Sequence, residues 1–252
     1  MGVVMEINQA APVHCSICGN TGPPVDNGNK SIRENFACAK CRSALRYRDQ
    51  GAIIVDEFSD GVATCIDQLV ARRCLDDVTI LECARRGPFM RRLRGLPRYS
   101  QSYYWEDVPF GTEVDGVSSQ DLRDLTYETD VFDLIITSDV FEHVFDHGRA
   151  FREVHRVLKP GGIHVCSIPV RYPLPANTFI RAEFREGAIV HHAEEIYHVS
   201  GEDEPSLVTV DYGADLLPTL RSTGYAASFV RRSSPSVPQM RNATLVCRKS
   251  CL

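Results

Sequence analysis

The region from Val131 to Gly162 has the clearest pattern of apolar and polar positions in the chain. Phe132 to Thr137 is a short apolar run rich in β-branched residues, which predicts a buried parallel strand. Apolar side chains then recur at helical spacing from Ala150 to Leu158, with charged residues on the other face, which predicts an amphipathic helix packed on a sheet. Residues 159–162 stop that helix, and Ile163 to Val170 forms a second buried strand. Strand, crossover helix and strand make the repeating unit of a doubly wound α/β sheet.

Weaker patterns predict further elements. Apolar positions at helical spacing within Ser43–Phe58 and Gly61–Cys74 predict a helical connector that covers the first strand or the ligand-binding edge of the sheet. The stretches on either side of residues 185–187 predict a β-hairpin. A helix within Leu207–Tyr225 precedes two closing strands, residues 226–232 and 243–250.

Length and composition limit the classes of protein. A chain of 252 residues with 43% hydrophobic content can bury one full core and add a small module. The net charge of −5 does not favour binding to nucleic acid or to an anionic membrane. No apolar run has the length of a membrane span. The first fifteen residues lack a basic start followed by a long apolar region, so we expect a cytoplasmic protein with reduced thiols.

Four of the ten cysteines have metal-ligand spacing. Two Cys-x-x-Cys pairs, nineteen residues apart, have the spacing of a zinc ribbon. The predicted ligands of a structural Zn²⁺ are Cys15, Cys18, Cys38 and Cys41. Four thiolates leave no open coordination position on the ion for catalysis. The site would therefore stabilise the fold of the N-terminus, dock a substrate or form an interface. Unmetallated or redox-active turns are the alternative interpretation.

The residues from Phe132 onward resemble the type 11-like branch of the class I S-adenosylmethionine-dependent methyltransferases. The resemblance rests on Phe132-Asp133, Glu142-His143 and the segment from Arg156 to Gly162, and it extends from about Val78 to Lys249. It implies a Rossmann-like α/β fold with a seven-stranded sheet, in which the two buried strands are the fourth and fifth. We therefore expect a zinc ribbon over residues 1–48, a helical connector over 49–76, and a methyltransferase domain over 77–252 with a substrate-lid insertion at 171–212.

The same resemblance implies which residues bind S-adenosylmethionine. Glu82 ends the first strand and supplies the acid that contacts the methionine part of the cofactor. The acid after the second strand, which binds the ribose hydroxyls, is Glu106, although Tyr103 and Tyr104 come first. Asp121 follows the third strand and accepts from the adenine amino group. The other implied cofactor-binding residues are Ala84, Arg86, Gly87, Leu122, Ser138 and Asp139.

The loop after the first strand departs from the family pattern. Ala84, Arg85 and Arg86 stand where the family has glycines, and only Gly87 remains. An arginine brings a Cβ and a long cation close to the expected cofactor position. A variant loop that still admits the cofactor and a methyltransferase fold that has lost it are both compatible with this sequence.

Acid–base residues are expected on the acceptor side. His198 is the first candidate, with Tyr197 beside it in the insertion and His143 after the fourth strand; His191 and His192 are weaker candidates. Each histidine has the alternative role of a cap or solvated side chain in a turn. The six arginines between Arg85 and Arg98 form either an anion-binding cluster or a solvated helix face.

These features predict an enzyme that transfers a methyl group from S-adenosylmethionine to a small-molecule acceptor and releases S-adenosylhomocysteine. A secondary metabolite, sugar or glycan, with or without an anionic group, fits this interpretation, and O- or N-methylation is favoured over C-methylation. A cofactor-free scaffold that binds a partner is the first alternative, and an RNA methyltransferase is the second. The sequence does not define the oligomeric state.

Overall fold

The computed structural model describes residues 12–198, 205–230 and 243–251. Its centre is a sheet whose strands lie in the order β15-β16-β8-β7-β3-β4-β6-β5. The strands are β3 (Ile80–Glu82), β4 (Tyr99–Tyr103), β5 (Glu113–Val114), β6 (Val117–Ser119), β7 (Phe132–Ser138), β8 (Leu158–Ser167), β15 (Tyr225–Val230) and β16 (Thr244–Lys249). The order reverses direction between β3 and β7, which makes their carboxyl ends the topological switch point of the sheet.

The pairing confirms the predicted sheet and adds one strand to it. β6, β4, β3, β7 and β8 are parallel, and β16 is antiparallel to both of its neighbours. β5 extends the expected seven strands to eight by forming a hairpin with β6. The turn of that hairpin is Asp115-Gly116, where both residues have positive φ, the conformation that favours an Asp-Gly turn.

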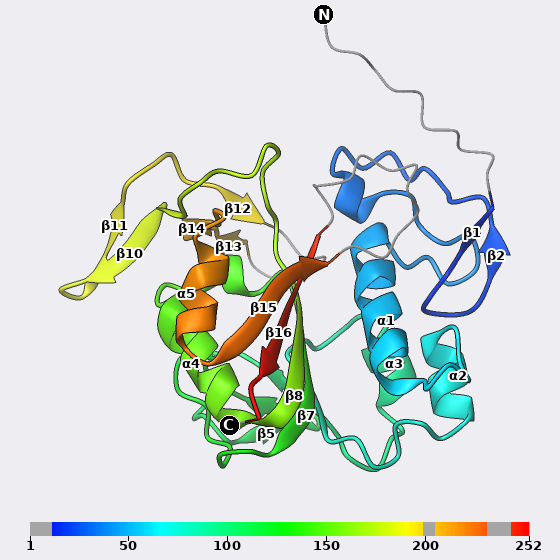
Figure 1. The fold of residues 1–252 in the computed structure, drawn as a ribbon. Coiled ribbons are helices and arrows are strands. Elements are labelled where there is room, and N and C mark those ends of the chain that lie inside the picture. The colour runs from blue at the N-terminus through cyan, green and yellow to red at the C-terminus, as the bar shows by residue number, and fades with distance from the viewer. Residues whose placement is uncertain (1–11, 199–204, 231–242, 252) are drawn as a thin grey trace, which may run out of the picture.

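Two layers of helices cover the sheet (Figure 1). One face carries α1 (Leu45–Phe58), α2 (Ile66–Ala71) and α3 (Met90–Leu93), and their apolar side chains pack on strand residues such as Ile80, Leu134 and Val165. The other face carries α4 (His147–Val157) and α5 (Leu216–Ser222), which pack on residues such as Ile135 and Leu245.

The structure shifts two predicted boundaries. The strand expected at Ile163–Val170 is β8, which begins directly after α4 at Leu158 because residues 159–162 belong to the strand as an irregular part, where the register with β7 shifts and Gly161 has a positive φ. The predicted connector helices are α1 and α2, and α1 starts at Leu45, so one helix crosses the expected limit at residue 48. Gln50 of α1 donates to the carbonyl oxygens of Thr137 and Val165, which ties α1 to β7 and β8.

The N-terminal module, residues 12–44, precedes α1. It contains β1 (Val13–His14) paired with β2 (Thr21–Gly22), and the one-turn helix η1 (Ile32–Glu34). The segment between the two cysteine pairs forms Asn- and Asp-rich turns closed by a single bridge between Val25 and Ala37. Residues 1–11 of the expected ribbon lie outside the described residues.

The insertion after β8 consists of short antiparallel pairs. They are β9 (Phe179–Ile180) with β14 (Val210–Asp211), β10 (Ala182–Arg185) with β11 (Ala188–His191), and β12 (Tyr197–His198) with β13 (Ser206–Leu207). β10 and β11 confirm the predicted hairpin around residues 185–187. Residues 199–204 of the expected lid, and Arg231 and Arg232 of the expected closing strand, lie outside the described residues.

Candidate functional site

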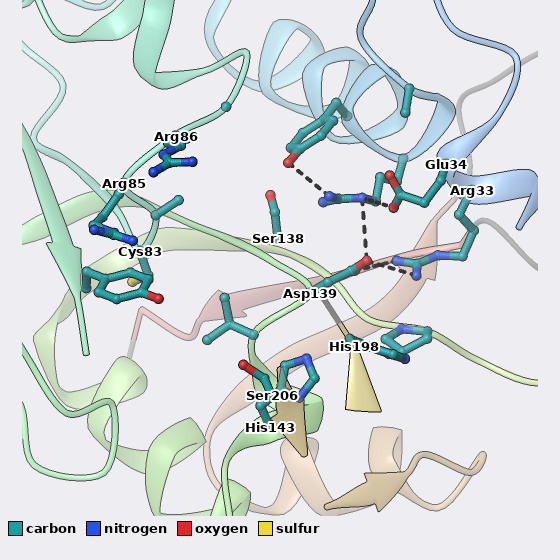
Figure 2. Close-up of a pocket in the computed structure, with 18 of the residues that line it drawn as sticks. Arg33, Glu34, Cys83, Arg85, Arg86, Ser138, Asp139, His143, His198 and Ser206 are labelled. Carbon is teal, nitrogen blue, oxygen red and sulfur yellow. Dashed lines mark hydrogen bonds and ion pairs between the residues drawn. The ribbon is translucent and has the colours of Figure 1, made fainter. Parts of the chain in front are cut away.

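A cleft of about 1410 Å³ lies at the carboxyl ends of the parallel strands. The sheet contributes its floor, the N-terminal module contributes one wall, and the insertion contributes another. In Figure 2, Arg85 and Arg86 lie on one side of Ser138 and Asp139, and His143 and His198 lie on the other. The cleft therefore has one end near the loop after β3 and another end near the insertion.

Glu82 is the last residue of β3 and is buried against the cleft. The Tyr99 hydroxyl donates to Glu82 Oε2 at 2.6 Å. Burial raises the pKa of Glu82 from 4.5 to about 8, and this effect exceeds the opposing effects of Tyr99 and of the Arg91 charge. Glu82 consequently holds a proton at neutral pH, and a ligand that carries a positive charge would favour its ionised form.

The loop after β3 keeps space beside this acid. Gly87 has a φ of +144°, and a Cβ at that position would lie 3.6 Å from Glu82 Oε1. Ala84 is fixed through its carbonyl oxygen, which accepts from Gln101 Nε2 at 2.7 Å. Arg85 stacks its guanidinium 4.4 Å above the Tyr103 ring, and Arg86 lines the cleft. These contacts hold the loop so that its backbone can lie close to a small ligand in the cleft.

The acids expected after the second and third strands have different positions. Asp121 and Leu122 line the cleft, and Arg123 pairs with both oxygens of the Asp121 carboxylate, the closest contact being 2.6 Å. Glu106 is exposed and does not line the cleft. Tyr103 ends β4 and lines the cleft where the family pattern has an acid. The structure thus brings Asp121 to the site and leaves Glu106 outside it.

Asp139 and Ser138, at the end of β7, connect the sheet to the N-terminal half of the chain. Arg33 donates to the two Asp139 carboxylate oxygens at 2.6 and 3.1 Å, and Ser167 donates to Oδ1 at 2.8 Å. The positive charges of Arg33 and Arg46 lower the pKa of Asp139 to about 2, against the opposing effect of burial. Ser138 donates to Gln50 of α1 at 2.9 Å.

Arg33 and Arg46 were not predicted from the sequence to be site residues. Arg33 lies 106 residues before Asp139 in the chain, within the turn-rich segment between the cysteine pairs. Both arginines and Glu34 line the cleft (Figure 2). An arginine in a loop carries no periodic signal, so its partner became evident only in the folded structure.

The acceptor end of the cleft contains two histidines. His143 belongs to η2 (Phe141–His143) and His198 to β12, and their rings meet edge to face at 5.1 Å. Burial lowers the pKa of both side chains below the usual 6.5, so both are neutral at neutral pH. Tyr197 also lines the cleft, although its hydroxyl donates to Glu195 at 2.6 Å. His191 and His192 lie outside the cleft lining, beside Glu195 and Glu183.

Glu142, which directly precedes His143 in the chain, is completely buried. Among the described residues, neither carboxylate oxygen has a hydrogen-bond partner. From the sequence, Glu142 was noted only as part of the Glu142-His143 motif.

The four predicted cysteine ligands converge in the N-terminal module. Their sulfur atoms all lie within 4.8 Å of one another, and both Cys15–Cys41 and Cys18–Cys38 are 3.7 Å apart. Four sulfurs at about 2.3 Å from a tetrahedral Zn²⁺ are separated by about 3.8 Å, so the arrangement fits this ion.

Both cysteine pairs have the same turn geometry. Gly19 donates its backbone N–H to the Cys15 carbonyl at 2.8 Å, and Arg42 donates to the Cys38 carbonyl at 2.9 Å. Gly19 and Arg42 also share a positive φ, of +73° and +63°. Two equivalent turns therefore present two sulfurs each to a common centre.

The arginines between Arg85 and Arg98 do not form one cluster. Arg85, Arg86 and Arg91 line the cleft. Arg92 pairs with Asp67 at 2.7 Å, and Arg98 lies 3.7 Å from Asp77. The segment thus combines a cleft-lining part with a part that pairs along the surface.

Comparisons with known proteins agree with the geometry. The methyltransferase domain family matches residues 107–166, which include β5 to β8 and α4. The match includes Asp121 and Asp139, which follow β6 and β7. The fold is Rossmann-like α/β, as the resemblance to the class I methyltransferases implied.

Several solved methyltransferase structures are similar to part of this chain. An S-adenosylmethionine-dependent methyltransferase from Mesorhizobium loti is 20% identical, covering 68% of this chain and 91% of its own, with a TM-score of 0.44. Streptomyces venezuelae DesVI is 16% identical, covering 82% and 96%, with a TM-score of 0.47. The sugar N-methyltransferase KedS8 from Streptoalloteichus sp. ATCC 53650 is 15% identical, covering 73% and 85%, with a TM-score of 0.45. No curated protein matches the chain.

Within the part of the chain that the structure describes, no helix is both long enough and apolar enough to cross a membrane.

Proposed function

We propose that this chain is an S-adenosylmethionine-dependent methyltransferase that methylates an oxygen or nitrogen atom of a small-molecule acceptor. The observation that carries the proposal is the buried, protonated Glu82 at the end of β3, beside a glycine that leaves room next to its carboxyl group. S-adenosylmethionine, when bound, supplies an electrophilic methyl group on a positively charged sulfur. A cationic ligand suits an acid whose ionisation is suppressed by burial.

Each end of the cleft has a separate role in this proposal. Glu82, Gly87 and Asp121 would hold the cofactor at the sheet edge, with Ala84, Arg86, Leu122 and Ser138 beside them. Tyr103 takes the place of the expected ribose-binding acid. His143, His198 and Tyr197 line the opposite end, where they would promote loss of the acceptor's proton as the new bond to the methyl carbon forms.

We further propose that Cys15, Cys18, Cys38 and Cys41 bind a structural Zn²⁺, which fixes the N-terminal wall of the cleft. Sulfur separations of 3.7 Å and the two equivalent turns support this assignment. The role that follows is positional, since the module presents Arg33 and Glu34 to the cleft.

Isothermal titration of the zinc-replete protein with S-adenosylmethionine and S-adenosylhomocysteine tests the cofactor assignment. We expect micromolar affinity for both ligands and a loss of about tenfold or more in Glu82→Gln, because the amide cannot pair with a cation. Asp107→Asn is the matched control, since Asp107 is exposed and outside the cleft lining. Absence of binding at millimolar ligand would support the cofactor-free scaffold. Strongly salt-dependent RNA binding would instead support the RNA methyltransferase.

A further inference from the structure

The acceptor end of the cleft contains a buried carboxylate that the methyltransferase proposal does not use. The Glu142 side chain has no exposed surface, and in the described part of the chain neither of its oxygens has a hydrogen-bond partner. Burial of such a group without compensation is unfavourable, and buried carboxylates are normally paired or coordinate metals. A bound cation would supply the missing partner.

Two imidazole nitrogens face the same carboxylate oxygen. Glu142 Oε1 lies 3.8 Å from His143 Nε2 and 3.7 Å from His198 Nδ1. These distances exceed a hydrogen bond, and the three candidate ligand atoms all lie within 4.8 Å of one another. Ligands at about 2.1 Å from a tetrahedral ion are separated by about 3.4 Å, so small side-chain shifts complete the arrangement.

The orientation of His143 suits a metal ligand. Its Nδ1 lies 2.9 Å from the Leu207 carbonyl oxygen, which can only accept, so Nδ1 carries the proton and Nε2 presents a lone pair toward Glu142. A metal-binding histidine typically donates its second ring nitrogen to a carbonyl or carboxylate in this way. The contact also ties His143 to β13, the strand that pairs with the one carrying His198.

The nearby charges permit a cation at this position. Arg33 and Arg46 are positive groups whose charges act on Glu142, and both pair with Asp139. Figure 2 shows the pair of Arg33 and Asp139 between the module and the two histidines. His143 and His198 line the cleft, whereas Glu142 lies behind them, so the remaining coordination positions of an ion would face the acceptor end.

We propose that Glu142, His143 and His198 form a second metal site, which binds a divalent transition-metal ion such as Zn²⁺, Co²⁺ or Mn²⁺ through two imidazoles and one carboxylate. Two nitrogens and one oxygen favour these ions over Mg²⁺. The site differs from the four-cysteine centre in ligand type and in having open positions toward the cleft. Its further role, which rests on the proposed methyltransferase function, is to bind the acceptor's hydroxyl or amine and promote loss of its proton.

Titration with Co²⁺ of protein that holds one zinc ion per chain, bound at the four cysteines, tests the site independently of activity. We expect one Co²⁺ per chain beyond the ribbon zinc, measured by metal analysis after gel filtration and by visible absorption without thiolate-to-cobalt bands. Glu142→Gln and His198→Ala should each weaken this binding at least tenfold. His192→Ala is the matched control, because His192 also faces a carboxylate, Glu183 at 3.0 Å, on the same insertion but outside the cleft. Its Co²⁺ affinity should equal that of the wild type.

Two results would overturn the site: no bound Co²⁺ in the wild type, or unchanged affinity in both ligand variants. If Glu142→Gln fails to fold, His198→Ala decides, since the His198 side chain is 42% exposed. Titration of the same samples with S-adenosylmethionine separates the two proposals. Cobalt binding without cofactor binding would refute the methyltransferase function alone, and cofactor binding without cobalt binding would refute the metal site alone.

Discussion

Glu82 and Asp139 lie at the carboxyl ends of the neighbouring strands β3 and β7, yet their surroundings shift their pKa values in opposite directions. Glu82 has a hydroxyl partner and burial raises its pKa to about 8. Asp139 pairs with Arg33 and Arg46, and its pKa falls to about 2. One acid thus anchors the N-terminal module, and the other stays available to a cationic ligand.

The comparison explains why strand ends alone do not define a ligand site. The resemblance placed Asp139 beside the cofactor, and Asp139 lines the cleft with both of its oxygens accepting from Arg33. Asp121 is likewise paired through both oxygens, in its case with Arg123 of the same loop. The strand-end acids therefore differ in the partners that the rest of the chain brings to them.

Removal of the proposed structural zinc should have the largest effect, because the N-terminal module carries Arg33, which pairs with Asp139. Zinc binding supplies on the order of 10 kcal/mol in small zinc modules, comparable with the whole stability of a domain. We expect chelation to lower the thermal midpoint by more than about 10 °C and to unfold residues 12–44 first. Calorimetry with hydrogen exchange would measure both, and re-addition of zinc should restore them. An unchanged midpoint after complete zinc removal would show that the module holds Asp139 without metal.

The pH dependence of stability should reveal the raised pKa of Glu82. In the unfolded chain Glu82 ionises near pH 4.5, whereas in the folded chain it keeps its proton to about pH 8. The folded state therefore binds more protons in this window, and its free energy of unfolding falls as the pH rises through it. Between pH 5 and 9 the wild type should lose on the order of 4 kcal/mol relative to Glu82→Gln. Parallel urea titrations at both pH values measure the difference, and parallel curves would contradict the raised pKa.

Loss of one arginine should weaken the anchor at Asp139 without removing it. The Arg33 side chain is 9% exposed and that of Asp139 is 19% exposed, so we expect Arg33→Ala to cost about 2 kcal/mol, less than a fully buried pair. Arg46 keeps part of the interaction at 3.4 Å. A double-mutant cycle with Asp139→Asn isolates the pair, and Arg94→Ala on the exposed part of the arginine segment is the control. Additive effects in the cycle would mean that the two side chains do not stabilise each other.

The elements that sequence reasoning predicted correctly are those with local periodic patterns. β7, α4 and β8 each bury a regular set of apolar positions, such as Phe151 and Val154 in α4, so their type and order follow from the chain itself. The cysteine spacing likewise predicted one sulfur cluster, because each Cys-x-x-Cys turn is local. The Asp115-Gly116 sequence is typical of a tight hairpin turn, so the β5–β6 hairpin could also have been predicted.

The contacts between distant segments could not be predicted in the same way. Arg33 and Asp139 are separated by 106 residues, and the local sequence around either residue does not indicate that they pair. Glu142 and His198 meet because β12 pairs with β13, a pairing of two-residue strands that no sequence period specifies. The walls of the cleft thus depend on tertiary packing, whereas its floor depends on the strand pattern.

Substitution of Glu106 should have the smallest effect of the variants considered, because Glu106 lies outside the cleft that Glu82 and Asp139 line. Glu106 was expected to bind the cofactor as the acid after the second strand, but it is exposed and outside the cleft lining. Glu106→Gln should change the affinity for S-adenosylmethionine less than twofold, which is about 0.4 kcal/mol. Tyr103→Ala at the end of β4 should weaken binding more, because Tyr103 lines the cleft and stacks with Arg85. Titration calorimetry at neutral pH compares both variants with the wild type. A loss of fivefold or more in Glu106→Gln would mean that the loop after β4 moves to bring this acid to the ligand.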